Sequence, residues 1–555
     1  VFTWHRSLAE DGFGSAERVI QPWDEEKGPR IVFADGTQSI YLSDMSGDGL
    51  TDIVRIRNGD VCYWPNLGYG HFSAKVTMDD APWFDHPDLF DQKRIRLADI
   101  DGSGTTDILY LGSHQIDIYF NQSGNSWSNS HPLTTFPRID NLVSVQVFDL
   151  LGNGTACLVW GSPLPGDAGR PMRYIKLMGE QKPHLLTTIK NNLGAETHIV
   201  YAPSTKFYLQ DRLAGKPWIT KLPFPVHCVE KVTVCDQWRH TEFTTTYSYH
   251  HGYFDGNERE FRGFGRVEQR DVESYNVFSA CNIDSSYITN DHTLYQPPIK
   301  TITWFHTGAS LDRQRILTQF EGEYFSNRFP EQTGFAEKPL PEPDFAEQDL
   351  TADEWREALR ACKGMVLRQE VYELDVDDLY DHQQEVPVRI FSATTHNCHI
   401  QRLQPTGDNR HAVFLVTESE ALTYHYELDL RAGRLEPDPR IAHTLNLRHD
   451  KYGNPQQSIA VMYPRVKQET DLSLADQLPL IRMVQGETHI AYIETRYTDD
   501  VLLPIASPPN ARIPLLHHRL RLPCEVLTYE LTGLPYPSQD TDPARRYFTI
   551  EALRK

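Results

Sequence analysis

Asp44-Met-Ser-Gly-Asp-Gly-Leu-Thr-Asp52 returns further along the chain as Asp99-Ile-Asp-Gly-Ser-Gly-Thr-Thr-Asp107, and this repeated stretch decides the fold class. Both copies follow the pattern D-x-[SD]-G-[DS]-G-x-x-D. Each copy is followed at once by an apolar run, residues 53–56 in the first and 108–111 in the second. Strand, acidic loop and strand that recur in this way are typical of repeat architectures, most naturally a β-propeller.

The polar side chains of the two loops fall at positions 1, 3, 5 and 9 of the pattern. They are Asp44, Ser46, Asp48 and Asp52 in the first loop and Asp99, Asp101, Ser103 and Asp107 in the second. Together with the carbonyl of position 7, these oxygens could wrap a hard cation such as Ca²⁺. Such an ion would be structural, because no position is left open for catalysis. The alternative is that Asp and Gly simply form tight turns between strands.

A third, degenerate copy occupies residues 147–160. It keeps Asp149, the glycines and the following apolar strand, but Leu151 and Cys157 replace two of the ligand positions. We therefore expect this copy to keep the turn and to lack the ion. No cofactor other than calcium is expected anywhere in the chain.

Charge and hydropathy exclude several classes of partner. The 76 Asp and Glu residues outnumber the 54 Lys and Arg, giving a net charge of −22. This balance argues against nucleic acid and against an anionic membrane surface as primary partners. No apolar run of about 18 residues occurs, so we expect no helix that spans a membrane directly. The sequence shows no signal peptide, and both of its ends look cut from a longer protein.

Beyond a Pro- and Gly-rich stretch at residues 161–169, longer strands replace the short repeats. These strands are rich in alternating β-branched and aromatic residues. They are predicted over residues 197–202, 229–235, 241–249, 421–430, 488–497 and 525–531.

One short helical insertion is expected near residues 352–362. Thr351 and Glu354 form a capping box at its start, and its apolar positions fall on one face. The preceding residues 328–346 are rich in Pro, Glu and Phe and predict an irregular surface excursion.

Three runs in the middle of the chain resemble a known family. They are Tyr201-Ala-Pro-Ser-Thr-Lys-Phe-Tyr208, Lys216-Pro-Trp-Ile-Thr-Lys-Leu-Pro-Phe-Pro-Val226 and Arg259-Glu-Phe-Arg-Gly-Phe-Gly-Arg-Val267. Together they resemble the B component of bacterial insecticidal toxin complexes (Tc toxins) and the related amino-terminal region of SpvB-type virulence proteins. The acidic loops, which are similar to FG-GAP repeats, fit the same family. Arg448-His-Asp-Lys-Tyr-Gly-Asn-Pro455 looks like a repeat of the Rhs type.

The resemblance implies a secreted bacterial toxin that acts as a container. In this family the B and C components form a hollow β-shell around a cytotoxic segment. The propeller of the B component docks on the A component, a pentameric translocation channel, and acts as a gate. The partners implied for this chain are therefore a C component and an A component.

The resemblance also divides this all-β chain into three parts. Residues 1–165 would be blades of a partial propeller, since a complete propeller needs more blades than these repeats supply. Residues 166–345 would be Rhs-type shell strands, and residues 346–555 would continue the shell and carry the short helix.

We expect no enzymatic activity in this chain. The motifs of serine hydrolases, zinc proteases and phosphate-binding loops do not occur. His250 and His251 with Asp255 could form an acid–base pair, but we expect them to be exposed polar side chains at the end of a hairpin.

Two other functions are open. One is an adhesin-like calcium-binding propeller that binds a ligand on a host surface, for which the strands after residue 188 would be unnecessary. The other is a carbohydrate-active enzyme, which requires paired carboxylates facing a cleft.

Overall fold

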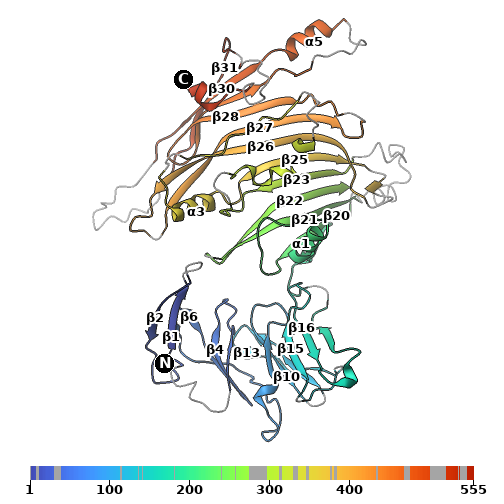
Figure 1. The fold of residues 1–555 in the computed structure, drawn as a ribbon, viewed down its shortest axis with the longest axis vertical. Coiled ribbons are helices and arrows are strands. Elements are labelled where there is room, and N and C mark those ends of the chain that lie inside the picture. The colour runs from blue at the N-terminus through green and yellow to red at the C-terminus, as the bar shows by residue number, and fades with distance from the viewer. Residues whose placement is uncertain are drawn as a thin grey trace.

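The computed structural model of the protein is mostly β-structure with few helices (Figure 1). It describes residues 2–7, 12–29, 39–112, 115–134, 137–140, 142–179, 182–238, 241–256, 258–273, 297–311, 315–328, 335–345, 349–375, 378–379, 384–409, 411–432, 435–467, 476–500, 520–535, 537 and 547–554. Within these ranges no helix has the length and apolar character needed to cross a membrane.

The first part of the chain forms a succession of small antiparallel sheets, at the bottom of Figure 1. The first has the order β3-β4-β5-β8, with strands Ile40–Ser43, Asp52–Arg57, Asp60–Trp64 and Val76–Thr77. The second has the order β14-β11-β10-β9, with strands His131–Leu133, Ile116–Tyr119, Asp107–Leu111 and Ile95–Ala98. The third has the order β15-β16-β17, with strands Ser144–Phe148, Cys157–Gly161 and Met172–Lys176.

Two-stranded hairpins accompany these sheets. They are β1–β2 (Phe2–Ser7 and Phe13–Val19), β6–β7 (Asn66–Gly68 and His71–Phe72) and β12–β13 (Asn121–Gln122 and Ser126–Trp127).

The strand that follows each acidic loop lies in the interior of its sheet. β4 and β10 are almost continuously buried, as expected for apolar runs covered on both faces. This arrangement confirms the strands predicted directly after the two loops. Ile108 and Tyr110 of β10 pack into one cluster with Val54 of β4, while Leu109 packs into another with Leu158 of β16. The sheets therefore stack on one another through hydrophobic cores.

A single large antiparallel sheet makes up most of the remaining structure and curves across the top of Figure 1. Its main path runs β18 to β23 and β25 to β31 in sequence order, while β24 pairs with β26 in parallel. Within the described residues this path is open and does not close into a barrel. Its strands are β18 Thr188–Lys190, β19 Ala195–Pro203, β20 His227–Asp236, β21 Thr241–Asp255, β22 Glu260–Glu273, β23 Ile299–Phe305, β24 Asp344–Phe345, β25 Val366–Leu374, β26 Pro387–Gln404, β27 Val413–Asp429, β28 Arg440–His449, β29 Pro455–Met462, β30 His489–Tyr497 and β31 Pro523–Glu530.

The predicted helix is present as α3 (Ala352–Ala361), with the capping box of Thr351 and Glu354 formed in both directions. The expectation of only one helical insertion was wrong. Further helices occur at α1 (Ser204–Leu213), α5 (Leu478–Gln485) and α6 (Ile550–Arg554). α1 has only a weakly amphipathic sequence and begins without a side-chain cap, so little in its local sequence marks it as a helix.

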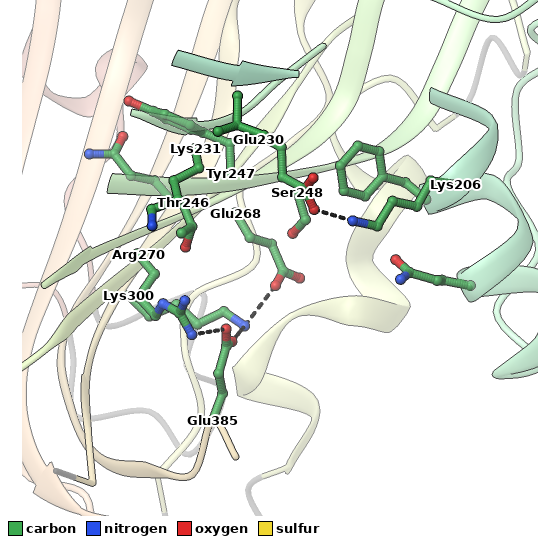
Figure 2. Close-up of a pocket in the computed structure, with 14 residues that line it drawn as sticks. Lys206, Glu230, Lys231, Thr246, Tyr247, Ser248, Glu268, Arg270, Lys300 and Glu385 are labelled. Carbon is green, nitrogen blue, oxygen red and sulfur yellow. Dashed lines mark hydrogen bonds and ion pairs between the residues drawn. The ribbon is translucent and has the colours of Figure 1, made fainter. Parts of the chain in front are cut away.

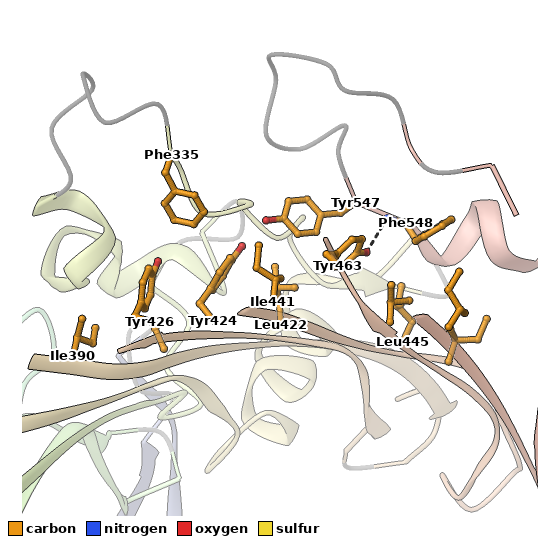
Figure 3. Close-up of a cluster of buried hydrophobic side chains, with 14 of the residues drawn as sticks. Phe335, Ile390, Leu422, Tyr424, Tyr426, Ile441, Leu445, Tyr463, Tyr547 and Phe548 are labelled. Atoms are coloured by element: carbon orange, nitrogen blue, oxygen red, sulfur yellow. Dashed lines mark hydrogen bonds between the residues drawn. The ribbon is translucent and has the colours of Figure 1, made fainter. Parts of the chain in front are cut away.

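One face of the large sheet is covered by two segments of the chain itself, residues 335–345 and 547–554, which we call the covering segments (Figure 3). Phe335 comes from the first covering segment, and Tyr547 and Phe548 come from the second. They pack on buried side chains of β25 to β30, among them Leu422 and Tyr424. The predicted irregular structure over residues 328–346 is confirmed for residues 335–343, but the predicted surface position was wrong for Phe335 and Lys338, which are buried. Residues 329–334 and 346 lie outside the described part of the chain.

Candidate cation-binding loops and a charged pocket

The first acidic loop is held together by its own carboxylates. Asp44 accepts backbone N–H bonds from Gly47 and Gly49, both at 2.8 Å, and a longer bond from the Ser46 hydroxyl at 3.4 Å. Asp48 accepts from the backbone N–H of Leu50 at 2.8 Å. These contacts are those of an Asp-Gly turn.

The second loop repeats this geometry almost bond for bond. Asp99 accepts from the N–H groups of Gly102 at 2.7 Å and Gly104 at 3.0 Å, and Asp101 accepts from the N–H of Ser103 at 2.9 Å. The glycines at these two positions have φ of +72° and +92°, a conformation that other residues adopt only with strain. The pattern D-x-x-G-x-G thus specifies the backbone of the loop.

The last Asp of each loop is fully buried and joins the loop to the next hairpin. Asp52 accepts from Met45 N–H at 2.9 Å and from Asn66 N–H at 2.8 Å. Asp107 makes the same two bonds, from Ile100 and from Asn121, at 2.8 and 2.9 Å.

The two asparagines were not singled out from the sequence. Their equal spacing in the sequence could have identified them, since each lies 14 residues after the buried Asp to which its N–H donates.

Burial has the largest effect on the pKa of Asp52, Asp99 and Asp107. It raises the pKa of Asp107 to about 7, despite the two N–H bonds that favour the ionised form. Burial also raises the pKa of Asp52 and of Asp99. The pKa of Asp101 is lowered instead, because hydrogen bonds from Ser103 and His184 outweigh burial.

The second loop brings together the side chains expected of a cation site. Oxygens of Asp99, Asp101 and Asp107 all lie within 4.8 Å of one another. Carboxylate oxygens at this spacing are suited to Ca²⁺, and ionised carboxylates that are costly to bury would be stabilised by it.

The chain also supplies cationic or basic groups at the second loop. His184 Nε2 lies 3.3 Å from Asp101, and the positive charge of Lys182 acts on Asp99. The residues present therefore fit a bound cation at the second loop, in competition with the chain's own basic side chains.

The third loop keeps the turn, as predicted. Asp149 accepts from Asn153 N–H at 3.1 Å and from Gly154 N–H at 2.7 Å. Cys157 takes the place of the buried Asp and is itself fully buried. This loop touches the large sheet, because Nε2 of His227 in β20 lies 2.9 Å from the carbonyl oxygen of Asn153. The third loop therefore connects the small sheets to the large sheet through this hydrogen bond.

A pocket of about 350 Å³ opens beside α1 over strands β19 to β23 (Figure 2). Most of its cations pair with carboxylates: Lys300 binds Glu268 and Glu385, each at 2.7 Å, and Arg270 binds Glu385 at 2.9 Å. Lys206 of α1 pairs with Glu230 of β20 (Figure 2). Because three of the four cations that line the pocket are held by its carboxylates, and Lys231 is the fourth, the pocket resembles a network of ion pairs between strands more than a binding site for a charged ligand.

The expected exposure of His250 and His251 was wrong, since both side chains are buried. His250 Nδ1 lies 2.6 Å from Asp211 of α1, and His251 Nε2 lies 2.8 Å from Glu323. Asp255 instead pairs with Arg262 at 2.7 Å. The two histidines thus fasten α1 and residues 318–323 to the sheet, and they do not form an acid–base pair with Asp255.

The sequence matches two family models of one kind of toxin. Residues 121–293 match the middle/N-terminal region of the insecticide toxin TcdB, and residues 357–491 match its middle/C-terminal region. Together these matches cover more than half of the chain. No curated protein matches the chain.

Solved structures of toxin complexes share the fold. The crystal structure of TcdB2–TccC3 is 28% identical over 92% of this chain, with a TM-score of 0.70. TcdB2–TccC3 without its hypervariable C-terminal region is 27% identical over 90%, with a TM-score of 0.69. The Photorhabdus luminescens Tc holotoxin pore is 26% identical over 95%, also with a TM-score of 0.69. The chain spans 22–23% of the length of these relatives.

Proposed function

Because the chain belongs to the TcdB-like B components of bacterial insecticidal toxin complexes, we propose that its large sheet forms part of the wall of a hollow shell that encloses a cytotoxic segment. The observation that carries this proposal is the unbroken antiparallel path from β18 to β31. Strands paired side by side over this length make a wide curved wall in which each strand covers the edges of its neighbours (Figure 1).

The small sheets, expected over residues 1–165 and extending to Lys176 at the end of β17, would form blades of the propeller gate that docks on the translocation channel. Their stacking and their three equivalent loops support this assignment. The loops resemble FG-GAP repeats. A calcium ion at the second loop would stabilise the fold of that loop and have no catalytic role. The shell would begin with β18 (Thr188–Lys190), after the expected boundary at residue 166, and residues up to 345 and residues 346–555 would be its successive stretches.

The partners in this proposal are a C component, which completes the shell and carries the cargo, and an A component, the pentameric channel. Solved relatives contain TcdB2 together with TccC3, and one is a holotoxin pore. The chain would act outside the bacterium that makes it, as a secreted toxin component without enzymatic activity. The adhesin alternative is disfavoured because a propeller that only binds a ligand has no need of the large sheet.

Electron microscopy of the protein co-expressed with a C component tests this proposal. The expected image is a hollow shell with a small-sheet domain at one end. A compact particle without an enclosed volume would contradict the shell and favour the adhesin.

A further inference from the structure

A chain of buried polar groups joins both covering segments to the large sheet. Lys338 of the first covering segment lies 3.5 Å from Oε2 of Glu420 in β27, and the same oxygen lies 3.0 Å from Nε2 of His443 in β28. Nδ1 of His443 lies 2.9 Å from the hydroxyl of Tyr463, which accepts the backbone N–H of Phe548 at 3.0 Å. The contact between Tyr463 and Phe548 is drawn in Figure 3.

The hydrogen-bond partners of His443 are compatible with its neutral form. The Tyr463 oxygen accepts from the backbone N–H of Phe548, and its hydroxyl can donate to Nδ1 of His443. The carboxylate of Glu420 can only accept, so Nε2 must carry the hydrogen. The network is therefore satisfied by a neutral His443 with its proton on Nε2.

Protonation of His443 reverses one of these bonds. Nδ1 becomes a donor, so the Tyr463 hydroxyl hydrogen has to turn away from it. The imidazolium would also share Glu420 with the ammonium of Lys338, which puts two cations on one buried carboxylate.

The titratable groups facing His443 in the described residues come from all the elements packed on it. They are Lys338 from the first covering segment, Glu420 of β27, Tyr463 after β29 and Tyr547 from the second covering segment. Burial lowers the pKa of His443, and the positive charge of Lys338 lowers it further, against the opposing effect of Glu420. The folded protein therefore favours the neutral form of His443, and a fall in pH favours its protonation.

We propose that this buried chain is an acid-sensitive latch, in which protonation of His443 releases residues 547–554 and then residues 335–345 from the sheet. A group whose pKa is lowered by folding stabilises the folded form above its unfolded value of about 6.5, and this contribution is lost as the pH falls below it. Release would uncover the aromatic surface formed by Tyr424, Tyr426 and Tyr463.

Hydrogen exchange measured by mass spectrometry at pH 7.5 and 5.0 tests the latch, with labelling times scaled to equal chemical exchange. Amides of residues 547–554 should exchange at least about tenfold faster at pH 5.0, which corresponds to a loss of about 1.4 kcal/mol of local stability. Amides of β26 and β27 should stay protected. Equal protection of the covering segments at both pH values, or simultaneous opening of β26 and β27, would overturn the proposal.

A variant that cannot be protonated at position 443 distinguishes release through His443 from other effects of acid on the protein. In His443→Gln the side chain can still donate to Glu420 and accept from Tyr463 but cannot be protonated, so residues 547–554 should exchange equally at both pH values. His425→Gln, on the exposed side of β27, is the matched control and should behave like the wild type.

If His443→Gln does not fold, Tyr463→Phe provides a second test. This change removes the acceptor of the Phe548 N–H, so residues 547–554 should already exchange rapidly at pH 7.5. Acid-dependent release that persists in His443→Gln, or full protection at pH 7.5 in Tyr463→Phe, would contradict the latch.

Discussion

At the scale of single residues, the last Asp of each of the first two acidic loops joins its loop to the hairpin that follows. Asp52 and Asp107 satisfy two backbone N–H groups each, and both are completely buried. The more exposed members of the loops, such as Asp48, bond only to the turn they lie in. The carboxylate at position 9 therefore fixes the hairpin that follows each of these two loops, whereas the turn itself depends on the Asp at position 1, which all three loops share.

Replacing Asp107 by Ala should lower the free energy of unfolding by about 2–4 kcal/mol, because two buried N–H groups lose their acceptor. Urea unfolding measures this change. Asp88→Ala is the control, since the side chain of Asp88 is 89% exposed and its loss should change stability by no more than about 0.5 kcal/mol.

A calcium ion bound by the acidic loops would change the thermal stability of the protein. Added Ca²⁺ should raise the melting temperature of the protein, and Asp44→Ala together with Asp99→Ala should lower that temperature and abolish the effect of the ion. The effect should be greater at pH 8 than at pH 6, because Asp107, with its pKa raised to about 7, must lose its proton to bind a cation. Melting that is the same with Ca²⁺ and with chelator would rule out the bound ion.

At the scale of elements, buried charges decide how the first covering segment lies on the sheet. Arg368 of β25 binds Glu337 of that segment at 2.6 Å and Glu370 at 2.7 Å. All three side chains are less than one-tenth exposed. The segment is thus fixed by an ion pair that exists only after the sheet has formed.

Arg368→Met should destabilise the protein by about 3–5 kcal/mol, because two buried carboxylates lose their shared cation. Hydrogen exchange should also show that residues 335–345 lose protection first. In the matched control Arg389→Met, the lost ion pair with Glu373 is partly exposed, and the expected change is at most about 1 kcal/mol. Equal effects of the two substitutions would contradict the anchoring role of Arg368.

At the scale of the whole molecule, Glu323 links several strands of the sheet. We expect its carboxylate to contribute folding stability that is lost in acid. Although its burial has the opposite effect, bonds and charge from His251, Arg266 and Trp304 lower its pKa to about 2. This contribution to stability is present above the unfolded value near 4.5 and is lost as the pH falls from there towards 2.

The free energy of unfolding, measured by urea titration between pH 5 and pH 3, should therefore fall with a slope to which Glu323 contributes. In Glu323→Gln this slope should be smaller, because the amide does not titrate. If the slope is the same in both proteins, other carboxyl groups are responsible for the acid sensitivity.

The sequence by itself determined the mostly β character, the strands after the acidic loops, the helix α3 and the toxin family. These features depend on short-range patterns: Asp and Gly at fixed spacing, alternating or continuous apolar runs, and the pair Thr351 and Glu354. The resemblance was carried by runs of eight to eleven residues, which need no tertiary context to be recognised.

Only the tertiary structure decided where the polar side chains go. His250, His251, Lys338 and His443 are buried because partners 20 to more than 80 residues away, on other elements, satisfy them. The same holds for the covering segment 335–345, whose Pro- and Glu-rich sequence is typical of a surface loop. Its Glu337 becomes tolerable in the interior once the sheet supplies Arg368, and that pairing depends on strand order and register, which local sequence does not encode.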